Sequence, residues 1–365
     1  MRDKRTLKFG DIVNSNAIII NGDVSIDGEV FNNVKNIFFE ILRDDFLRYS
    51  GEAIIQAKIE INNLMLNVFE RLVKEQLTQL TEKFKSPSIQ VFLHDTLVGY
   101  ITNENDDVKD LIVDILIDRL KIDNVGTEKA ILNDAIKLIP NLNSSTSSLI
   151  ALLNLRNQVA IPAISFMLES FFMQISPIIN NSCNINNIDI EYIKQANCTQ
   201  QITGIYHIDS YENHLLKQYD LYFRQKGSIE IFNNFRNDHP EIMHQVNDMG
   251  TCMFCLIDKE KKWWRFCDVN TNLFYKRLIK RRQEYLIPLI EKLKATVPPL
   301  SNSEVREYLC NINMNWKYVF DLLNSSELNT VSLNVLGSYI GSKIISKYTN
   351  GKALSFTSIS NPVAL

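Results

Sequence analysis

Glycine and proline are scarce in this chain, which has 12 Gly and 9 Pro among 365 residues. Average proteins use about 7% Gly and about 5% Pro. Few tight turns and few glycine-rich phosphate loops can therefore form here. The scarcity favours long helices and argues against a dinucleotide-binding fold or a β-sandwich.

The common catalytic and nucleotide-binding motifs are absent. The chain contains no G-x-x-x-x-G-K-[ST], G-x-G-x-x-G, H-E-x-x-H or G-x-S-x-G, which mark phosphate loops, dinucleotide sites, zinc proteases and nucleophile elbows. The five His do not lie at a catalytic spacing with a Ser or Cys. We therefore predict no catalytic residue and favour a protein that is not an enzyme.

Cysteine and net charge are also low. Six Cys are too few for a disulfide scaffold in a chain of this length. The charged residues 1–5 are not followed by an apolar segment, so we expect a cytoplasmic, reduced protein without a secretory signal. The net charge of −3 gives no overall indication of nucleic acid or an anionic membrane as partner.

The first thirty residues differ from the rest because they are rich in strand formers. β-Branched runs at 17–20 and 24–28 flank the turn dipeptide Asn21-Gly22, which predicts a β-hairpin or β-arch. An isolated hairpin is marginal in water. Its strands must pair with the body of this chain or with another copy, unless the segment is an unpaired tail. The predicted assembly residues are Ile18, Ile20, Asn21, Gly22, Val24 and Ile26.

Helical periodicity begins near residue 32 and predicts a mainly α fold. We predict an N-terminal β assembly segment at 1–30, a helical domain at 31–180, and a mixed then helical C-terminal domain at 181–365. Short strands are expected near 202–208 and 252–257. The helix that opens at Ser303 lacks a full capping box, because Arg306 stands three residues on. Predicted helices cover 32–46, 52–84, 88–101, 108–120, 127–140, 149–179 with an interruption near Pro162, 189–196, 271–297 and 333–348.

The most apolar stretch of the chain is 159–179. It is long enough to cross a bilayer, but it contains Glu169, Gln174 and two prolines. One charge at the centre of a span costs about 3 kcal/mol on insertion scales. The favoured interpretation is a buried core helix, and conditional membrane insertion is the alternative.

A cysteine-rich segment is the sharpest candidate for a metal site. Cys252, Cys255 and Cys267, with His239 and His244 upstream, could hold Zn²⁺ tetrahedrally. A zinc ribbon normally has two paired knuckles, however, and Cys267 stands alone. A redox pair would need a βαβ context that is missing. We favour structural cysteines in a core and expect no cofactor.

A basic run and an acidic run stand out in this nearly neutral chain. Basic residues beside Trp263-Trp264 are typical of nucleic-acid or phosphate binding, although a solvated helix face is the simpler explanation. The acidic series at helical spacing could bind a divalent metal or the basic run of a partner, but a solvated face is again favoured. The basic residues are Lys276, Arg277, Lys280, Arg281 and Arg282, and the acidic ones Asp107, Asp110, Asp114 and Asp118.

Several stretches together resemble a known type of chain. The tract 10–20 with its Gly, Asp and Asn, the acidic helix at 105–119, the segment from Tyr192 to Cys198 and the helix at 333–341 are all similar to a widespread, largely uncharacterised bacterial family. The resemblance implies an N-terminal Gly/Asp/Asn β tract followed by a long helical body. The family has no established activity, so no catalytic residue is transferred. Similar tracts resemble the assembly segments of immune-type effectors.

Three functions follow as hypotheses. The first is a homo-oligomer, an interaction protein that assembles through its N-terminal β segment in response to a protein trigger, in a bacterial anti-phage role. The second is a nucleic-acid-binding or nuclease-like protein that uses the helix at 276–282. The third is a membrane-perturbing effector that uses 159–179.

Overall fold

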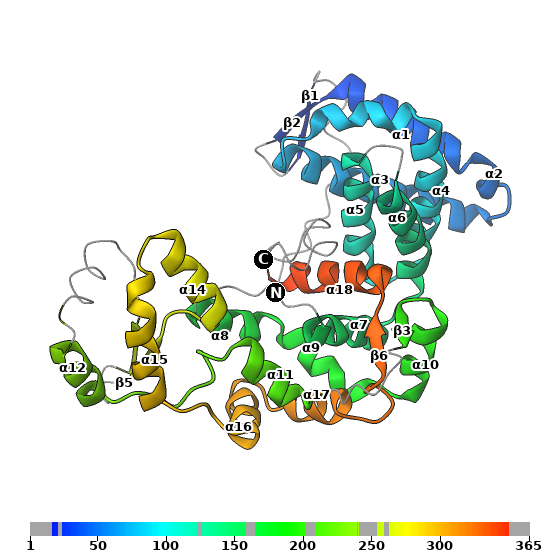
Figure 1. Cartoon of the computed structure of the whole chain (residues 1–365). Helices are drawn as coiled ribbons and strands as arrows, with labels where there is room; N and C mark the ends of the chain where they lie inside the picture. Colours follow the sequence, from blue (N-terminus) through cyan, green and yellow to red (C-terminus); the bar gives the residue numbers. More distant parts are fainter. Residues whose placement is uncertain are drawn as a thin grey trace. The chain divides into compact units, whose positions relative to one another are not determined.

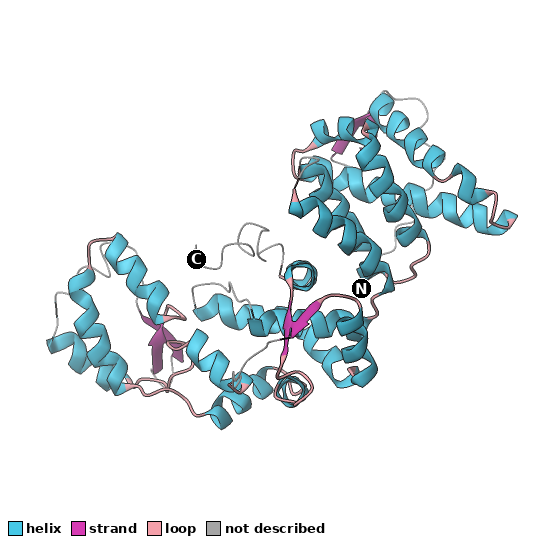
Figure 2. Cartoon of the chain, turned by 45° about the vertical axis from the view of Figure 1, so that its right-hand side comes forward, coloured by secondary structure: helices cyan, strands magenta, loops and turns pink. Residues whose placement is uncertain are grey.

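The computed structural model shows a mainly α-helical protein (Figures 1 and 2), which confirms the predicted fold class. It describes residues 17–20, 24–122, 126–157, 165–201, 209–238, 240, 254–258 and 263–349. Within these residues the strands form three two-stranded antiparallel sheets. The chain divides into two compact units, residues 1–142 and 143–365, and each is described by itself. This division differs from the boundaries predicted after residues 30 and 180.

Unit 1 begins with the predicted hairpin. Strands β1 (Ala17–Ile20) and β2 (Val24–Asp27) pair antiparallel, with Ile18 opposite Ile26. Helix α1 (Gly28–Ile41) follows directly, and β2 lies against both α1 and α3 (Gly51–Lys74). The hairpin therefore packs on the body of its own chain.

The rest of unit 1 is a helical bundle. Its helices bury an apolar core that includes Phe38, Leu64, Leu93 and Leu116, each 0% exposed. Burial of such side chains is the main favourable term in folding. The elements are α2 (Arg43–Phe46), α3 (Gly51–Lys74), the 3-10 helix η1 (Thr78–Lys85), α4 (Pro87–Ile101), α5 (Asp106–Lys121), α6 (Thr127–Leu138) and η2 (Ile139–Asn141).

Unit 2 combines helices with two small sheets. Strand β3 (Thr199–Gln201) pairs with β6 (Val331–Leu333), and β4 (Phe254–Asp258) pairs with β5 (Trp263–Phe266). The helices are α7 (Ser144–Asn157), α8 (Ser165–Gln174), α9 (Ser176–Asn181), η3 (Ser182–Asn184), α10 (Asn187–Gln195), α11 (Tyr211–Gln218), α12 (Ile229–Asp238), α14 (Thr271–Lys280), η4 (Glu284–Leu286), α15 (Ile287–Thr296), α16 (Asn302–Ile312), α17 (Trp316–Leu323) and α18 (Val335–Tyr348).

The centre of unit 2 is the close contact between α7 and α18. A Cβ atom at Gly341 would lie 2.6 Å from Cβ of Asn154, and one at Gly337 would meet the carbonyl oxygen of Cys198. Only glycine fits at these two positions. The Asn154 Nδ2 donates to Ser342 Oγ at 3.2 Å, which links the two helices further. The resemblance noted at 333–341 thus falls on a helix whose small residues permit this packing.

Two predicted helices are shorter than expected. The helix predicted over 52–84 ends at Lys74, and that over 271–297 ends at Lys280 before resuming at Ile287. Each of these helices is followed by a residue in the left-handed backbone conformation, Gln76 (φ 58°) after α3 and Arg282 (φ 58°) after α14. The helix-ending motif normally has glycine at this position, so the sequence carried no signal for it.

The predicted start of α16 was wrong by two residues. Ser301, not Ser303, is the N-cap, and Glu304 completes a capping box: the Ser301 side chain accepts from the Glu304 N–H, and the Glu304 carboxylate accepts from the Ser301 N–H at 2.7 Å. These paired bonds satisfy donors that helix ends leave free. The predicted strand at 202–208 lies outside the described residues.

Candidate functional site

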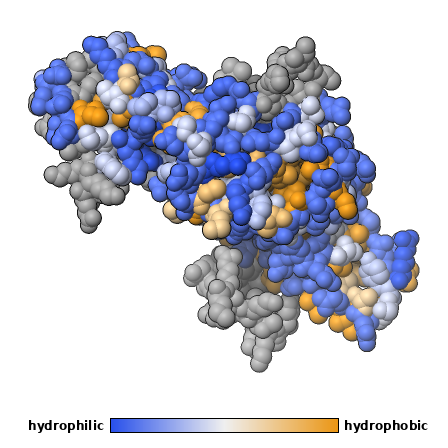
Figure 3. Space-filling view, turned by 90° about the horizontal axis from the view of Figure 1, so that it is seen from below, coloured by the Kyte–Doolittle hydropathy of each residue, from blue (hydrophilic) through white to orange (hydrophobic). Residues whose placement is uncertain are grey.

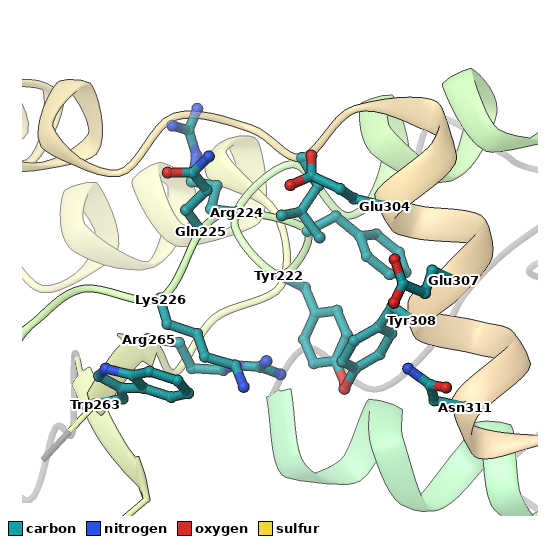
Figure 4. Close-up of a pocket in the computed structure, with 12 residues that line it drawn as sticks. Tyr222, Arg224, Gln225, Lys226, Trp263, Arg265, Glu304, Glu307, Tyr308 and Asn311 are labelled. Carbon is teal, nitrogen blue, oxygen red and sulfur yellow. The ribbon is translucent and has the colours of Figure 1, made fainter. Parts of the chain in front are cut away.

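A cavity of about 450 Å³ lies in unit 2 (Figure 4). One wall is formed by the segment after α11 and by β5, and the other by α16. Volumes of 300–1,000 Å³ are typical of small-molecule sites. The lining residues on which the chemistry depends are Tyr222, Lys226, Trp263, Arg265, Glu307, Tyr308 and Asn311.

Hydrogen bonds hold the segment after α11 in place. Arg224 donates through Nη1 to the carbonyls of Lys294 at 2.8 Å and Val297 at 2.7 Å, near the end of α15. The Leu300 N–H donates to the Phe223 carbonyl at 3.0 Å. At the other end, the backbones of Gly227 and Trp264 exchange hydrogen bonds of 3.1 and 3.0 Å. This wall of the cavity is therefore anchored at both ends.

The floor of the cavity is a cluster of one guanidinium and two phenols. The Arg265 guanidinium carbon lies 4.4 Å from the Tyr222 ring centre and 5.9 Å from that of Tyr308. The two phenol oxygens are 2.6 Å apart. Burial would lower the pKa of Arg265, but its interactions with the two tyrosines outweigh burial and raise it. Burial also raises the pKa of Tyr222, so at neutral pH its phenol is neutral beside the positively charged Arg265.

The two sides of the cavity differ in character. On the first wall, Lys226 Nζ lies 4.6 Å from the centre of the Trp263 ring, a cation–π contact. On the α16 wall, Glu307 and Asn311 face the cavity in Figure 4. The remaining carboxylate, Glu304, is occupied by its bonds to Ser301, which lower its pKa. A ligand here would meet cations on one side and acceptors on the other.

Sequence patterns pointed to only part of this site. Trp263 is an aromatic neighbour of the predicted basic run. Glu307 and Tyr308 lie more than forty residues further along the chain, so no local pattern connects them with Trp263. Their one-turn spacing on α16 to Asn311 is a helical signal that carries meaning only once the fold places α16 beside β5.

The structure places the predicted basic residues at the C-terminal end of α14. Lys276, Lys280, Arg281 and Arg282 are exposed. Arg277 is instead half-buried and forms an ion pair with Asp268. Burial raises the pKa of Asp268 to about 6, although Arg277 and Arg281 act against this rise. The five residues therefore do not act as one set, because Arg277, in the last turn of α14, is paired with the buried Asp268.

The predicted metal residues are only partly described. Cys252, His239 and His244 lie outside the described residues, and Cys255 is placed only as a backbone position in β4. Cys267 follows β5 and is buried, at 8% exposure. Among the residues that the structure describes, no group of three or more His, Cys, Asp and Glu side chains could hold a metal ion.

The acidic series lies along α5, beside α3. Asp114 forms an ion pair with Arg71 of α3. Two further pairs use lysines of α5: Lys109 Nζ lies 2.7 Å from an oxygen of Glu60 in α3, and Lys121 Nζ lies 2.7 Å from an oxygen of Glu75, the residue after α3. Of the acidic series, Asp114 thus helps to align α5 with α3.

The predicted assembly residues occupy the hairpin. Ile18 and Ile20 lie in β1, and Val24 and Ile26 in β2, with Ile20 opposite Val24. Asn21 and Gly22 lie outside the described residues. The described part of the apolar stretch 159–179 forms α8 and α9, which are separated at Ile175.

None of the helices in the described part of the chain is both long and apolar enough to span a bilayer. Leu168, Phe172 and Ile179 of the apolar stretch are buried, as we favoured for this stretch. On the face drawn in Figure 3, hydrophobic residues form separate patches among hydrophilic ones.

Comparison with known proteins places the chain in a family without assigning it an activity. No curated protein and no solved structure matches it. A family model of uncharacterised proteins matches residues 28–358, and the match starts at the first residue of α1. The Gly/Asp/Asn tract that contributed to the resemblance lies before this match. The chain thus belongs to this uncharacterised family through nearly the whole of its helical body.

Proposed function

We propose that this chain is an interaction protein that assembles with further copies through its N-terminal hairpin. The observation that carries the proposal is the two-stranded sheet β1–β2. Neither strand pairs with a third strand among the described residues, so each has an outer edge with unpaired backbone groups. Such edges add strands from another chain.

The position of the hairpin fits this role. Because β2 lies against α1 and α3, the body supports the hairpin in one orientation. A supported edge is pre-organised for pairing, which lowers the entropy cost of association. Assembly of this kind upon a protein trigger is how a bacterial anti-phage protein could act, and that part of the proposal depends on the resemblance of the N-terminal tract alone.

Deletion of residues 1–27 tests assembly, because it leaves α1 whole and removes only residues before the family match. Light scattering coupled to size exclusion would measure the mass of the full chain, of this deletion and of a deletion of 1–16 that keeps β1 and β2. We expect the full chain to be oligomeric and the 1–27 deletion to have a lower mass. An equal mass for all three would contradict the proposal.

A second candidate function is nucleic-acid binding at the end of α14. The observation in its favour is the exposure of Lys276, Lys280, Arg281 and Arg282 on one short segment, with Ile279 also 56% exposed. Cations grouped in this way attract phosphate backbones and release counterions.

The double substitution Lys280→Glu and Arg282→Glu tests this candidate. We expect binding of a single-stranded or duplex oligonucleotide to weaken steeply with salt, and to be lost in the variant. The matched control is Lys58→Glu and Arg48→Glu, which changes exposed charges of unit 1. Equal binding by both variants would remove this candidate.

A further inference from the structure

The cavity beside α16 contains two cations without a carboxylate partner. Neither Arg265 nor Lys226 forms an ion pair with any carboxylate of the described residues, and the Nε atom of Arg265 is buried without a hydrogen-bond partner there. Buried cations in proteins are normally paired, because desolvation of an unpaired charge is costly. Lys226 is exposed and hydrated, so the need for a partner falls on Arg265. This part-buried guanidinium, with Lys226 also lining the cavity, makes the cavity favourable for an anion.

The opposite wall restricts what that anion can be. Glu307 offers a carboxylate that only accepts hydrogen bonds, and Asn311 offers an amide that both accepts and donates. Both side chains face the cavity from α16 in Figure 4. A simple inorganic anion would leave this wall unused and would be repelled by Glu307. The ligand should therefore carry amino or hydroxyl donors at a distance from its negative group.

We propose that this cavity binds a small organic anion with hydrogen-bond donors, and specifically a nucleoside monophosphate. The phosphate lies against Lys226 and Arg265, and the amino and hydroxyl groups of the base and ribose face Glu307 and Asn311. A volume of about 450 Å³ lies within the range of sites for molecules of this size. Side chains, not a glycine-rich loop, would hold the phosphate, in keeping with the scarcity of glycine.

An amino acid shares this chemistry, since it has a carboxylate and an ammonium group. It is a smaller molecule, and its two charges lie close together, whereas Lys226 and Glu307 lie on opposite walls. The larger separation of the phosphate from the base favours the nucleotide. This site belongs to unit 2 and does not depend on assembly through the hairpin.

Calorimetric titration of the full chain tests the proposal with three probes: AMP, inorganic phosphate and L-glutamine. Three variants accompany the wild type. Lys226→Gln removes a cation of the cavity, Glu307→Gln removes the acceptor charge, and Lys292→Gln is the control, because Lys292 is exposed on α15 and does not line the cavity. Circular dichroism would verify that each variant is folded.

We expect AMP to bind more tightly than phosphate. Lys226→Gln should weaken AMP binding at least tenfold and reduce its salt dependence. Glu307→Gln should weaken the binding of AMP but not that of phosphate. Lys292→Gln should change the affinity for neither probe. Failure of AMP to bind at millimolar concentration would overturn the proposal, as would equal effects of Lys226→Gln and Lys292→Gln. Tighter binding of L-glutamine than of AMP would overturn the assignment to a nucleotide.

Discussion

At the scale of single residues, Asp268 connects electrostatics to stability most directly. Its side chain is buried beside Arg277, and burial raises its pKa from 3.8 to about 6. The folded protein therefore holds this proton more tightly than the unfolded chain does. The protonated Asp268 carboxyl therefore favours the folded state. This contribution to the free energy of unfolding is fully present below about pH 4 and is lost as the pH rises through about 6.

Substitution of this residue gives the first prediction. In Asp268→Asn the pH-dependent contribution disappears, so the stability of the wild type relative to the variant should fall between pH 4 and pH 7, by on the order of 2 kcal/mol. Urea unfolding at pH 4.5, 5.5, 6.5 and 7.5 would measure it. Parallel curves for the two proteins over this range would show that the Asp268 carboxyl titrates normally.

At the scale of elements, the chain ends helices without glycine. After α3, the Leu77 N–H donates to the Leu72 carbonyl at 2.6 Å and the Gln76 N–H to the Val73 carbonyl at 2.9 Å. The same bonds recur after α14, around Arg282. This geometry needs a left-handed residue, and a side chain there costs about 1 kcal/mol compared with glycine.

Gln76→Gly should therefore stabilise the protein by up to about 1 kcal/mol, because it removes the strain of a positive φ. Gln76 is exposed, so little packing is lost. The matched control is Lys74→Gly, in the last helical position of α3, which should cost about 1 kcal/mol. Thermal unfolding would rank the three proteins. If both variants lost stability, the conformation of Gln76 would not be a source of strain.

The contact between α7 and α18 provides a second prediction at this scale. Gly341→Ala would bring a methyl group within 2.6 Å of Asn154 and should destabilise the protein by about 1–3 kcal/mol through overpacking. Gly51→Ala is the control, because nothing lies within 4 Å of a Cβ at the start of α3. It should be neutral or slightly stabilising. Equal denaturation midpoints for the two variants would argue against close packing of α7 and α18.

The elements also show how far local sequence can be interpreted. Periodicity predicted α4, α5, α10 and α18 well, because the apolar residues of each helix face the core of its own unit. It failed where helices end, since Gln76 and Arg282 look like helix formers and not terminators. The cavity was missed for a different reason. Its walls come from residues 222–226, 263–265 and 304–311, and no local pattern shows that these segments meet.

At the scale of the whole molecule, the chain divides into two compact units after Leu142. The composition of the Ser-rich residues 143–148 is typical of a linker and of a helix cap, and in the structure Ser144 begins α7. Asn143 accepts from the Thr146 N–H at 2.8 Å and caps this first turn. The boundary after Leu142 thus lies where this Ser-rich stretch caps and begins a helix.

Unit 1 should fold when it is expressed alone as residues 28–142. Its core is internal, with Phe38, Leu93 and Leu116 fully buried, and the ion pairs between α3 and α5 lie wholly within it. We expect a helical circular dichroism spectrum and cooperative unfolding in urea, as for other domains of about 100 residues. A shorter fragment, 28–121, is the comparison. It ends with α5, lacks α6, and should unfold at lower urea because α4 and α5 lose the helix they pack against. A non-cooperative transition for 28–142 would mean that unit 1 acquires its stability only in the full chain.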